Sequence, residues 1–150
     1  MRPRTFWSCV IIGCLVATAM ILLHFGPGIH PKAPADTTAY RNSLRISYIN
    51  QLADGLRAYY KSSGSWPITM PTQPTQICTT SGSDCMQKNL VDLSFLTTAG
   101  NYIIGIPHDP NGGRGQWGSG FYIQQLPNGN VLLTAPKAEA GRTISQTVST

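Results

Sequence analysis

Charged residues and histidines are scarce in this sequence: 11% of the residues are charged and only three are histidine. Outside the hydrophobic segment only His30 and His108 remain, far apart in sequence, and the six acidic residues are scattered, so we find no pair placed to act as a general acid and base. Neither a Gly-x-Ser-x-Gly nor a His-Glu-x-x-His pattern occurs. We therefore expect the protein not to be an enzyme and to carry no catalytic residue, cofactor or metal.

A concentrated excess of positive charge is also missing from most of the chain. The net charge of +5 includes Arg2, Arg4 and Lys32, which flank a hydrophobic segment. From residue 33 onward, eight Lys and Arg residues stand against six Asp and Glu residues. Nucleic-acid-binding domains gather basic residues in a patch or stripe. Nucleic acid is therefore not an expected partner.

Long hydrophobic runs are absent except for residues 6–25, which contain no charged residue. A helix of about 20 residues spans the hydrocarbon core of a bilayer. Because Arg2 and Arg4 precede the run, we expect a single-pass membrane protein with a cytoplasmic N-terminus and an extracytoplasmic C-terminal domain. The alternative is a secretory signal cleaved near residues 17–19, but the apolar residues 20–23 that follow favour an uncleaved anchor.

Prolines separate the anchor from the rest of the chain. Pro27, Pro31 and Pro34 cannot continue a regular helix, so residues 26–35 are predicted to form a short linker. The domain organisation is then a cytoplasmic stub and transmembrane helix over residues 1–25, the linker, and a globular domain over residues 36–150.

A long amphipathic helix is predicted from an N-cap at Asp36 or Thr37 to about Lys61. Its apolar and aromatic residues recur every three or four positions: Tyr40, Leu44, Tyr48, Ile49, Leu52, Ala53, Leu56, Tyr59 and Tyr60. We interpret this stripe as a core face rather than a binding groove. Arg41 and Arg45 are expected to lie mostly outside it. Gly55 predicts the close approach of another backbone.

Four cysteines fall into two groups. Cys9 and Cys14 lie in the hydrophobic run, where we interpret them as small apolar residues rather than lipid-attachment sites. Cys78 and Cys85 lie in a middle segment rich in Thr, Pro, Gln and Ser, and their spacing differs from that of a redox pair or a zinc site. Outside the cytoplasm we favour a disulfide between them, over free thiols and over a metal site.

The second half predicts a short helix and a small antiparallel sheet. The helix covers residues 89–96, with Asn89 as its cap and Asp92 in its first turn. Strands are expected over residues 121–126 and 131–134, joined by a hairpin turn that contains Asn128-Gly129. Residues 143–148 could add an edge strand. The predicted fold class is therefore α+β, with the long helix packed on one face of the sheet.

Glycines cluster in residues 108–120, and we interpret this segment as a loop. It leads into a strand and lacks Gly-Lys-Ser/Thr, so it does not predict a phosphate-binding loop. Asp109 and Asn111 offer too few oxygen ligands for us to prefer a calcium site, although calcium remains an alternative.

Several short patterns occur in an order that resembles a known family. The long helix ends in Tyr59-Tyr60-Lys61-Ser62-Ser63-Gly64-Ser65-Trp66-Pro67. There follow the two-cysteine segment, then Leu90-Val91-Asp92-Leu93, then Ile106-Pro107-His108-Asp109-Pro110 and an aromatic strand hairpin. This order resembles the type IV pilin and type II secretion pseudopilin superfamily. There the helix commonly ends Tyr-Tyr-x-x-x-Gly-x-Tyr-Pro, and a Pro-x-Asp-Pro loop precedes the sheet; Trp66 here replaces the Tyr.

The resemblance implies a minor pilin or pseudopilin, whose membrane helix packs in a shared bundle while its globular head faces outward. Its implied partners are the membrane, other pilin-like subunits and secretion or pilus assembly proteins. Family precursors carry a glycine followed by a Phe-Thr-Leu-Ile-Glu-like start, which residues 1–7 lack. An alternative function is a monomeric, membrane-anchored extracytoplasmic binding module that uses an exposed loop with Trp117, Phe121 and Tyr122. We favour the interpretation that these aromatics are core or strand-pair residues.

Overall fold

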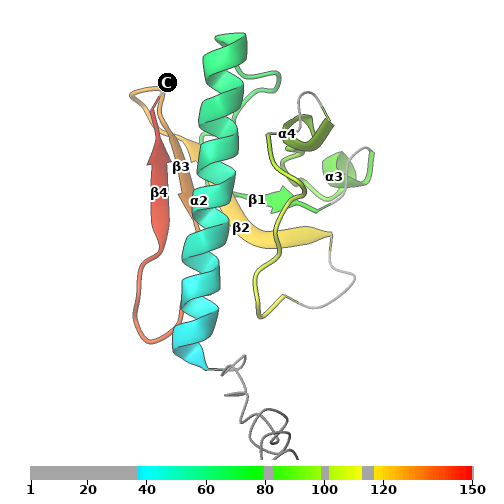
Figure 1. The fold of residues 1–150 in the computed structure, drawn as a ribbon. Coiled ribbons are helices and arrows are strands. Elements are labelled where there is room, and N and C mark those ends of the chain that lie inside the picture. Colours follow the sequence, from blue (N-terminus) through cyan, green and yellow to red (C-terminus); the bar gives the residue numbers. More distant parts are fainter. Residues whose placement is uncertain (1–36, 80–82, 99–101, 113–116, 150) are drawn as a thin grey trace, which may run out of the picture. The chain divides into compact units, whose positions relative to one another are not determined.

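The computed structural model describes residues 37–79, 83–98, 102–112 and 117–149. In these ranges one long helix packs on a four-stranded antiparallel sheet, so the predicted α+β class is confirmed (Figure 1). The predicted transmembrane helix and linker lie outside the described residues. Among the residues that are described, no helix combines the length and the hydropathy needed to cross a bilayer.

The long helix, α2, covers Thr38–Ser63, close to the predicted span. Thr37 caps its start, as predicted, because the Thr37 side chain accepts a hydrogen bond from the Tyr40 N–H at 3.2 Å. Gly64 ends the helix with a φ of 73°, a left-handed conformation that favours glycine, and its N–H bonds to the Tyr60 carbonyl at 2.8 Å. The helix therefore extends two residues past Lys61, to the residue before this glycine.

One face of α2 is buried, and it differs from the predicted stripe at its N-terminal end. Ile49, Leu52, Ala53 and Leu56 are buried as expected, whereas Tyr40 is 37% exposed. Arg45, expected outside this face, is fully buried, so that prediction is wrong. The burial of Arg45 depends on two carboxylates from other parts of the chain, which the helix periodicity does not encode.

The sheet has the strand order β1-β2-β3-β4, with every neighbouring pair antiparallel. Its strands are β1 (Thr75–Cys78), β2 (Gly118–Gln125), β3 (Val131–Thr134) and β4 (Ser145–Val148). The predicted β2–β3 hairpin is confirmed: the Leu126 N–H bonds to the Asn130 carbonyl at 2.8 Å, and Gly129 has a φ of 86°. β4 confirms the expected edge strand, while β1 was not predicted.

The predicted helix over residues 89–96 is wrong. Asn89 has a φ of 53°, and Val91 forms a parallel bridge with Ile77 of β1 instead of continuing a helix. The Asp92 carboxylate accepts the Ser94 N–H at 2.8 Å, which turns the chain. Only α4 (Phe95–Thr98) is helical here, and a further short helix, α3 (Ser83–Gln87), precedes the segment.

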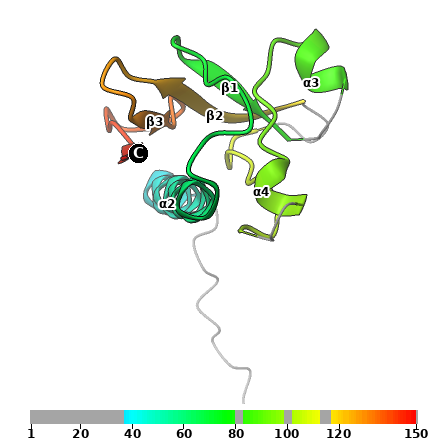
Figure 2. The same ribbon diagram turned by 90° about the horizontal axis from the view of Figure 1, so that it is seen from above.

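The core lies between α2 and the sheet. Figure 2 shows α2 end-on beneath the strands, with α4 beside it. Leu52 and Leu56 belong to one cluster with Phe121, Ile123 and residues of β3 and β4, all of them buried. At Gly55 an added Cβ would lie 2.7 Å from Ile103 Cγ2. The predicted close approach is therefore real, but the neighbour is a side chain rather than a backbone.

Candidate functional site

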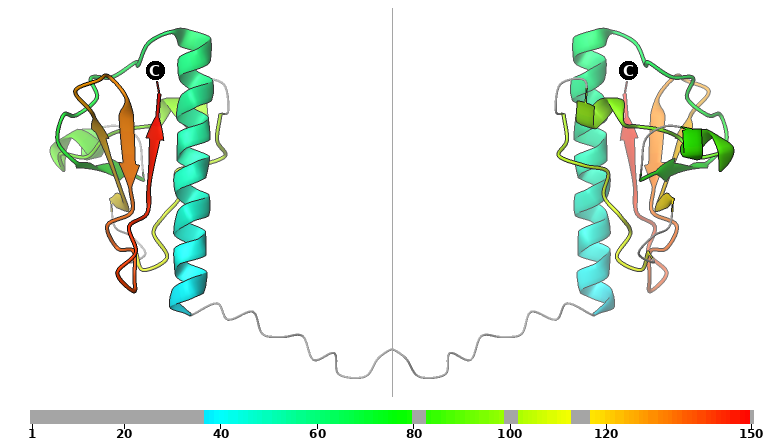
Figure 3. Two further views of the ribbon diagram at one scale, coloured as in Figure 1. Left: turned by 90° about the vertical axis from the view of Figure 1, so that its left-hand side faces the viewer. Right: turned by 90° about the vertical axis from the view of Figure 1, so that its right-hand side faces the viewer.

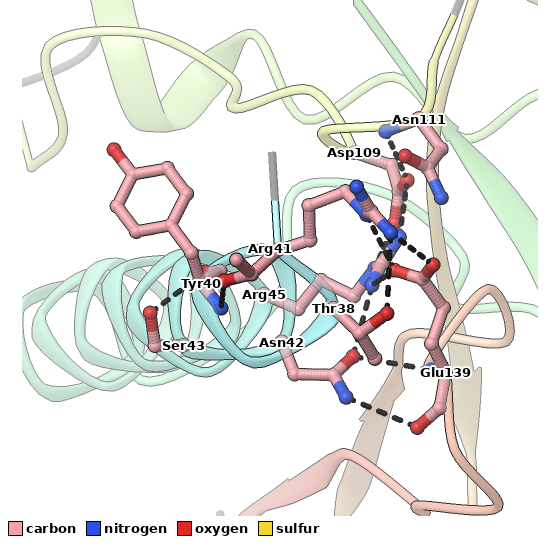
Figure 4. Close-up of polar contacts among 10 residues, drawn as sticks. Thr38, Tyr40, Arg41, Asn42, Ser43, Arg45, Asp109, Asn111 and Glu139 are labelled. Carbon is pink, nitrogen blue, oxygen red and sulfur yellow. Dashed lines mark hydrogen bonds and ion pairs between the residues drawn. The ribbon is translucent and has the colours of Figure 1, made fainter. Parts of the chain in front are cut away.

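Arg45 is the centre of a buried polar cluster at the N-terminal end of α2 (Figure 4). Its Nε donates to Asp109 Oδ2 at 2.8 Å, and its Nη2 donates to Asp109 Oδ1 at 3.2 Å. Both side chains have no exposed area. The bidentate geometry joins α2 to the loop that precedes β2, at sequence positions 64 residues apart.

A second carboxylate, Glu139, bridges Arg45 and Arg41. Arg45 Nη1 lies 2.8 Å from Glu139 Oε2, and the Arg41 guanidinium donates to both Glu139 oxygens at 2.7 Å. These hydrogen bonds, from Arg41 first and then Arg45, lower the pKa of Glu139 from 4.5 to about 2. Glu139 is therefore ionised at any pH at which the protein would ordinarily work.

Asn42 completes the cluster by binding the backbone of Glu139. Its Oδ1 accepts hydrogen bonds from Arg45 Nη1 at 2.9 Å and from the Glu139 N–H at 3.1 Å. Its Nδ2 donates to the Glu139 carbonyl at 3.0 Å. The two hydrogen bonds between Asn42 and the Glu139 backbone thus attach the turn between β3 and β4 to the start of α2.

The turn that carries Glu139 adopts a strained backbone. Ala140 has a φ of 57° and Gly141 a φ of 66°, and the Arg142 N–H bonds to the Glu139 carbonyl at 3.3 Å. A left-handed conformation costs an alanine about 1 kcal/mol or more. The contacts of Glu139 with α2 hold the turn in this conformation.

Asp109 is positioned by its own loop before it contacts Arg45. Its N–H bonds to the Ser119 carbonyl at 2.8 Å, and its Oδ1 accepts the Asn111 N–H at 2.8 Å. Gly120 has a φ of 85°, and a Cβ there would lie 2.7 Å from Asp109 Cβ. The glycine therefore permits the close approach of β2 to this loop.

The cluster is suited to holding segments together rather than to chemistry. Arg45 donates nearly all its N–H groups to Asp109, Asn42 and Glu139. The hydrogen bond to Asp109, and to a smaller extent the one to Glu139, raises the pKa of Arg45. Both carboxylates are already bonded to guanidinium groups. Within the described part of the chain, no three His, Cys, Asp or Glu side chains lie together as a metal site needs.

The disulfide favoured from the sequence is present. Cys78 and Cys85 are bonded with an S–S distance of 2.06 Å and a Cα–Cα distance of 5.7 Å, and both are buried. The bond joins the end of β1 to α3. It contributes no metal-binding thiolate, and its role is structural.

The residues that carry the family resemblance fall into two separate places. The rings of Tyr60 and Trp66 pack at a tilt beside the Gly64 cap, with centroids 4.8 Å apart, and Pro67 follows. The Tyr59 ring packs edge-on against Phe95, with centroids 4.6 Å apart. Trp66 Nε1 is buried and has no hydrogen-bond acceptor among the residues that the structure describes. Asp109, which lies between Pro107 and Pro110, instead binds Arg45. At 1.5 Å per residue, Arg45 is about 22 Å from Tyr60 along α2, toward its N-terminus. The two groups of family-like residues therefore do not form one site.

The aromatic loop suggested for a binding module is only partly exposed. Trp117 is 44% exposed, but Phe121 is fully buried against Tyr48, with ring centroids 6.2 Å apart. Tyr122 is half-buried. The favoured interpretation of these aromatics as core or strand-pair residues is confirmed for Phe121, and the alternative that all three line an exposed loop is wrong.

Comparisons with known protein families, with curated proteins and with solved structures found no match for this chain. Its function therefore has to be inferred from its own residues and geometry.

Proposed function

We propose that this protein is a structural subunit or assembly-associated component of a type IV filament or type II secretion-like system, resembling a minor pilin or pseudopilin. In this proposal residues 6–25 anchor it in a membrane and the described domain lies outside the cytoplasm. The observation that carries the proposal is the position of α2, which follows the hydrophobic segment in sequence and packs lengthwise on an antiparallel sheet (Figure 3).

The contacts made by the family-like residues support this proposal. The Tyr-Tyr end of α2 packs against Trp66, and the Asp109 loop is bonded to the same helix. Both patterns therefore serve to attach the chain to α2. In a subunit whose membrane helix packs in a shared bundle, the outer domain keeps a fixed position only if it is rigidly attached to the helix that follows the anchor.

The disulfide supports an extracytoplasmic location. Cys78 and Cys85 are joined, and structural disulfides persist mainly in oxidising compartments. The enzyme alternative gains no support from the polar cluster, because its carboxylates and guanidinium groups neutralise one another.

Exchanging the anchor tests the proposal. Residues 6–25 would be replaced by an unrelated leucine-alanine helix of the same length in a host that assembles the wild-type protein. We expect the variant to stay in the membrane but to lose co-purification with filament or assembly proteins, because the shared bundle depends on this helix. A matched control carries Lys88→Ala on the exposed surface and should assemble normally.

If the exchanged variant assembles as well as the wild type, the anchor has no specific packing role. That result would favour the second candidate, a monomeric anchored binding module, for which the partly exposed Trp117 is the supporting observation.

A further inference from the structure

β4 is an edge strand of the described sheet, so one side of its backbone is not paired with another strand. The Ala135 N–H bonds to the Ile144 carbonyl at 2.9 Å, and the β3–β4 register continues without a shift. Backbone groups alternate sides along an antiparallel strand, so those of Gln146 and Val148 point toward β3. The N–H and C=O groups of Ser145 and Thr147 therefore point outward, away from the sheet.

A groove runs beside this edge, between β4 and α2. Its volume is about 300 Å³, and it is lined by Ile46, Ile49 and Asn50 of α2 and by residues 142–146. Ile46 is 38% exposed although it is aliphatic. The groove lining is mostly polar, and Ile46 is its one well-exposed aliphatic side chain among the described residues. An edge strand beside such a groove matches the geometry of strand addition, in which the main chain supplies affinity and side-chain contacts supply specificity.

The groove also carries an unneutralised positive charge. Arg142 lines the groove and is exposed, and among the described residues its one recorded bond is the backbone hydrogen bond to Glu139. Residues 141–150 contain no Asp or Glu. A second copy of β4 could therefore not place a carboxylate of its own strand opposite Arg142, so self-pairing is disfavoured.

Arg57 partly covers the other end of the edge. Its Nη2 donates to the outward carbonyl of Thr147 at 3.3 Å, while its Nη1 pairs with Asp54 at 2.6 Å. This side chain is 42% exposed, so an incoming strand could displace it. Charged residues at a sheet edge commonly limit unwanted strand pairing.

We propose that the β4 edge and its groove bind an extended segment of another protein by strand addition. The segment would bond to the outward groups of Ser145 and Thr147, insert an aliphatic side chain over Ile46, and place a carboxylate against Arg142. This proposal does not depend on the proposed function, since it uses only contacts of the described domain.

Blocked hexapeptides binding to the full chain in detergent micelles test the proposal. The acidic probe is Asp-Thr-Val-Thr-Val-Asp; a basic probe has Lys at both ends, and a third acidic probe has a central Pro that removes an N–H. We expect the acidic probe to bind at least about tenfold more tightly than either control. Amide exchange should slow at Ser145 and Thr147, but not at Gln146 or Val148, whose N–H groups are already bonded.

Two variants separate the contribution of the Arg142 charge from that of the Thr147 carbonyl. Arg142→Gln should abolish the preference for the acidic over the basic probe, because it removes the only charge proposed to distinguish them. Arg57→Gln should tighten binding of the acidic probe about two- to fivefold, since it removes the shorter of the two side-chain hydrogen bonds to the Thr147 carbonyl and leaves only that from Gln146 Nε2 at 3.4 Å. The proposal is overturned if no probe binds, if acidic and basic probes bind equally, or if protection at Ser145 and Thr147 comes from dimerisation of the chain without peptide.

Discussion

The Arg45 guanidinium lies 2.8 Å from the Asp109 carboxylate, and both side chains are fully buried. Through this pair and Glu139, the start of α2 is bonded to the loop before β2 and to the turn between β3 and β4. Burying charged groups costs several kcal/mol per ion unless each is paired and hydrogen-bonded. Because each buried charge in the cluster is paired and hydrogen-bonded, the cluster is compatible with a folded domain.

Removing one partner of the buried pair should be strongly destabilising. We expect Arg45→Met to lower the free energy of unfolding by about 3–5 kcal/mol, because it leaves Asp109 buried and uncompensated. Urea denaturation of the full chain, followed by tryptophan fluorescence, measures this change. The control Arg57→Gln removes the exposed pair with Asp54 and should cost about 1 kcal/mol or less. Equal, small losses for both variants would show that the buried cluster does not stabilise the fold.

Stability should fall in acid through Glu139. Its pKa is about 2 in the folded protein, below its ordinary value of 4.5, so its contribution is complete above pH 4.5 and is lost as the pH falls toward 2. We expect the wild type to lose more stability over this interval than Glu139→Gln does. Denaturation midpoints at pH 6, 4 and 2.5 give the comparison. Parallel pH profiles for the two proteins would contradict the assignment.

The left-handed turn next to Glu139 should gain stability from glycine. Ala140→Gly removes the steric cost of a φ of 57°, partly offset by the entropy of glycine, so we expect a gain of about 0.5–1 kcal/mol. Ala58→Gly, at an exposed position inside α2, should instead lose about 1 kcal/mol. Thermal unfolding of both variants checks the opposite signs. A loss at position 140 would mean that the turn is not held in this conformation.

Gly55 should resist the usual stabilising effect of alanine in a helix. The added methyl group would lie 2.7 Å from Ile103 Cγ2, so we expect Gly55→Ala to destabilise the domain by about 1–3 kcal/mol. Ile103→Ala removes the obstructing Cγ2 atom but also destabilises the domain by removing a buried side chain. In a double-mutant cycle the two substitutions should therefore be less damaging together than their sum. Additive effects would indicate that the two residues are not in contact.

The elements predicted well from the sequence are those with local signals. Thr37 and Gly64 bound α2 through capping chemistry, and Asn128-Gly129 specifies the hairpin. β1 carries no such signal, because it has only four residues, half of them polar, and depends on pairing with β2 and on the bridge to Val91. That same bridge removes Val91 from the helix predicted over residues 89–96.

The candidate site was predictable only in part. The expected extracytoplasmic location and the spacing of Cys78 and Cys85 predict the disulfide that the structure contains. The family resemblance singles out Asp109, but not its contact with Arg45. Arg45 was missed because hydrophobic periodicity treats arginine as solvent-facing, although it shares the spacing of Ile49, Leu52 and Leu56. Its carboxylate partners lie 64 and 94 residues away, a distance that no local pattern reports.

Crosslinking the intact protein in its native membranes tests the proposed filament role most directly. An amine-reactive reagent would act on exposed lysines, including Lys88 and Lys137, before denaturing electrophoresis. We predict a ladder at multiples of the 16.2 kDa chain, or defined products with other pilin-like subunits, in the membrane fraction. A protein recovered only as an uncrosslinked monomer, or washed free of the membrane with residues 6–25 missing, would contradict the account.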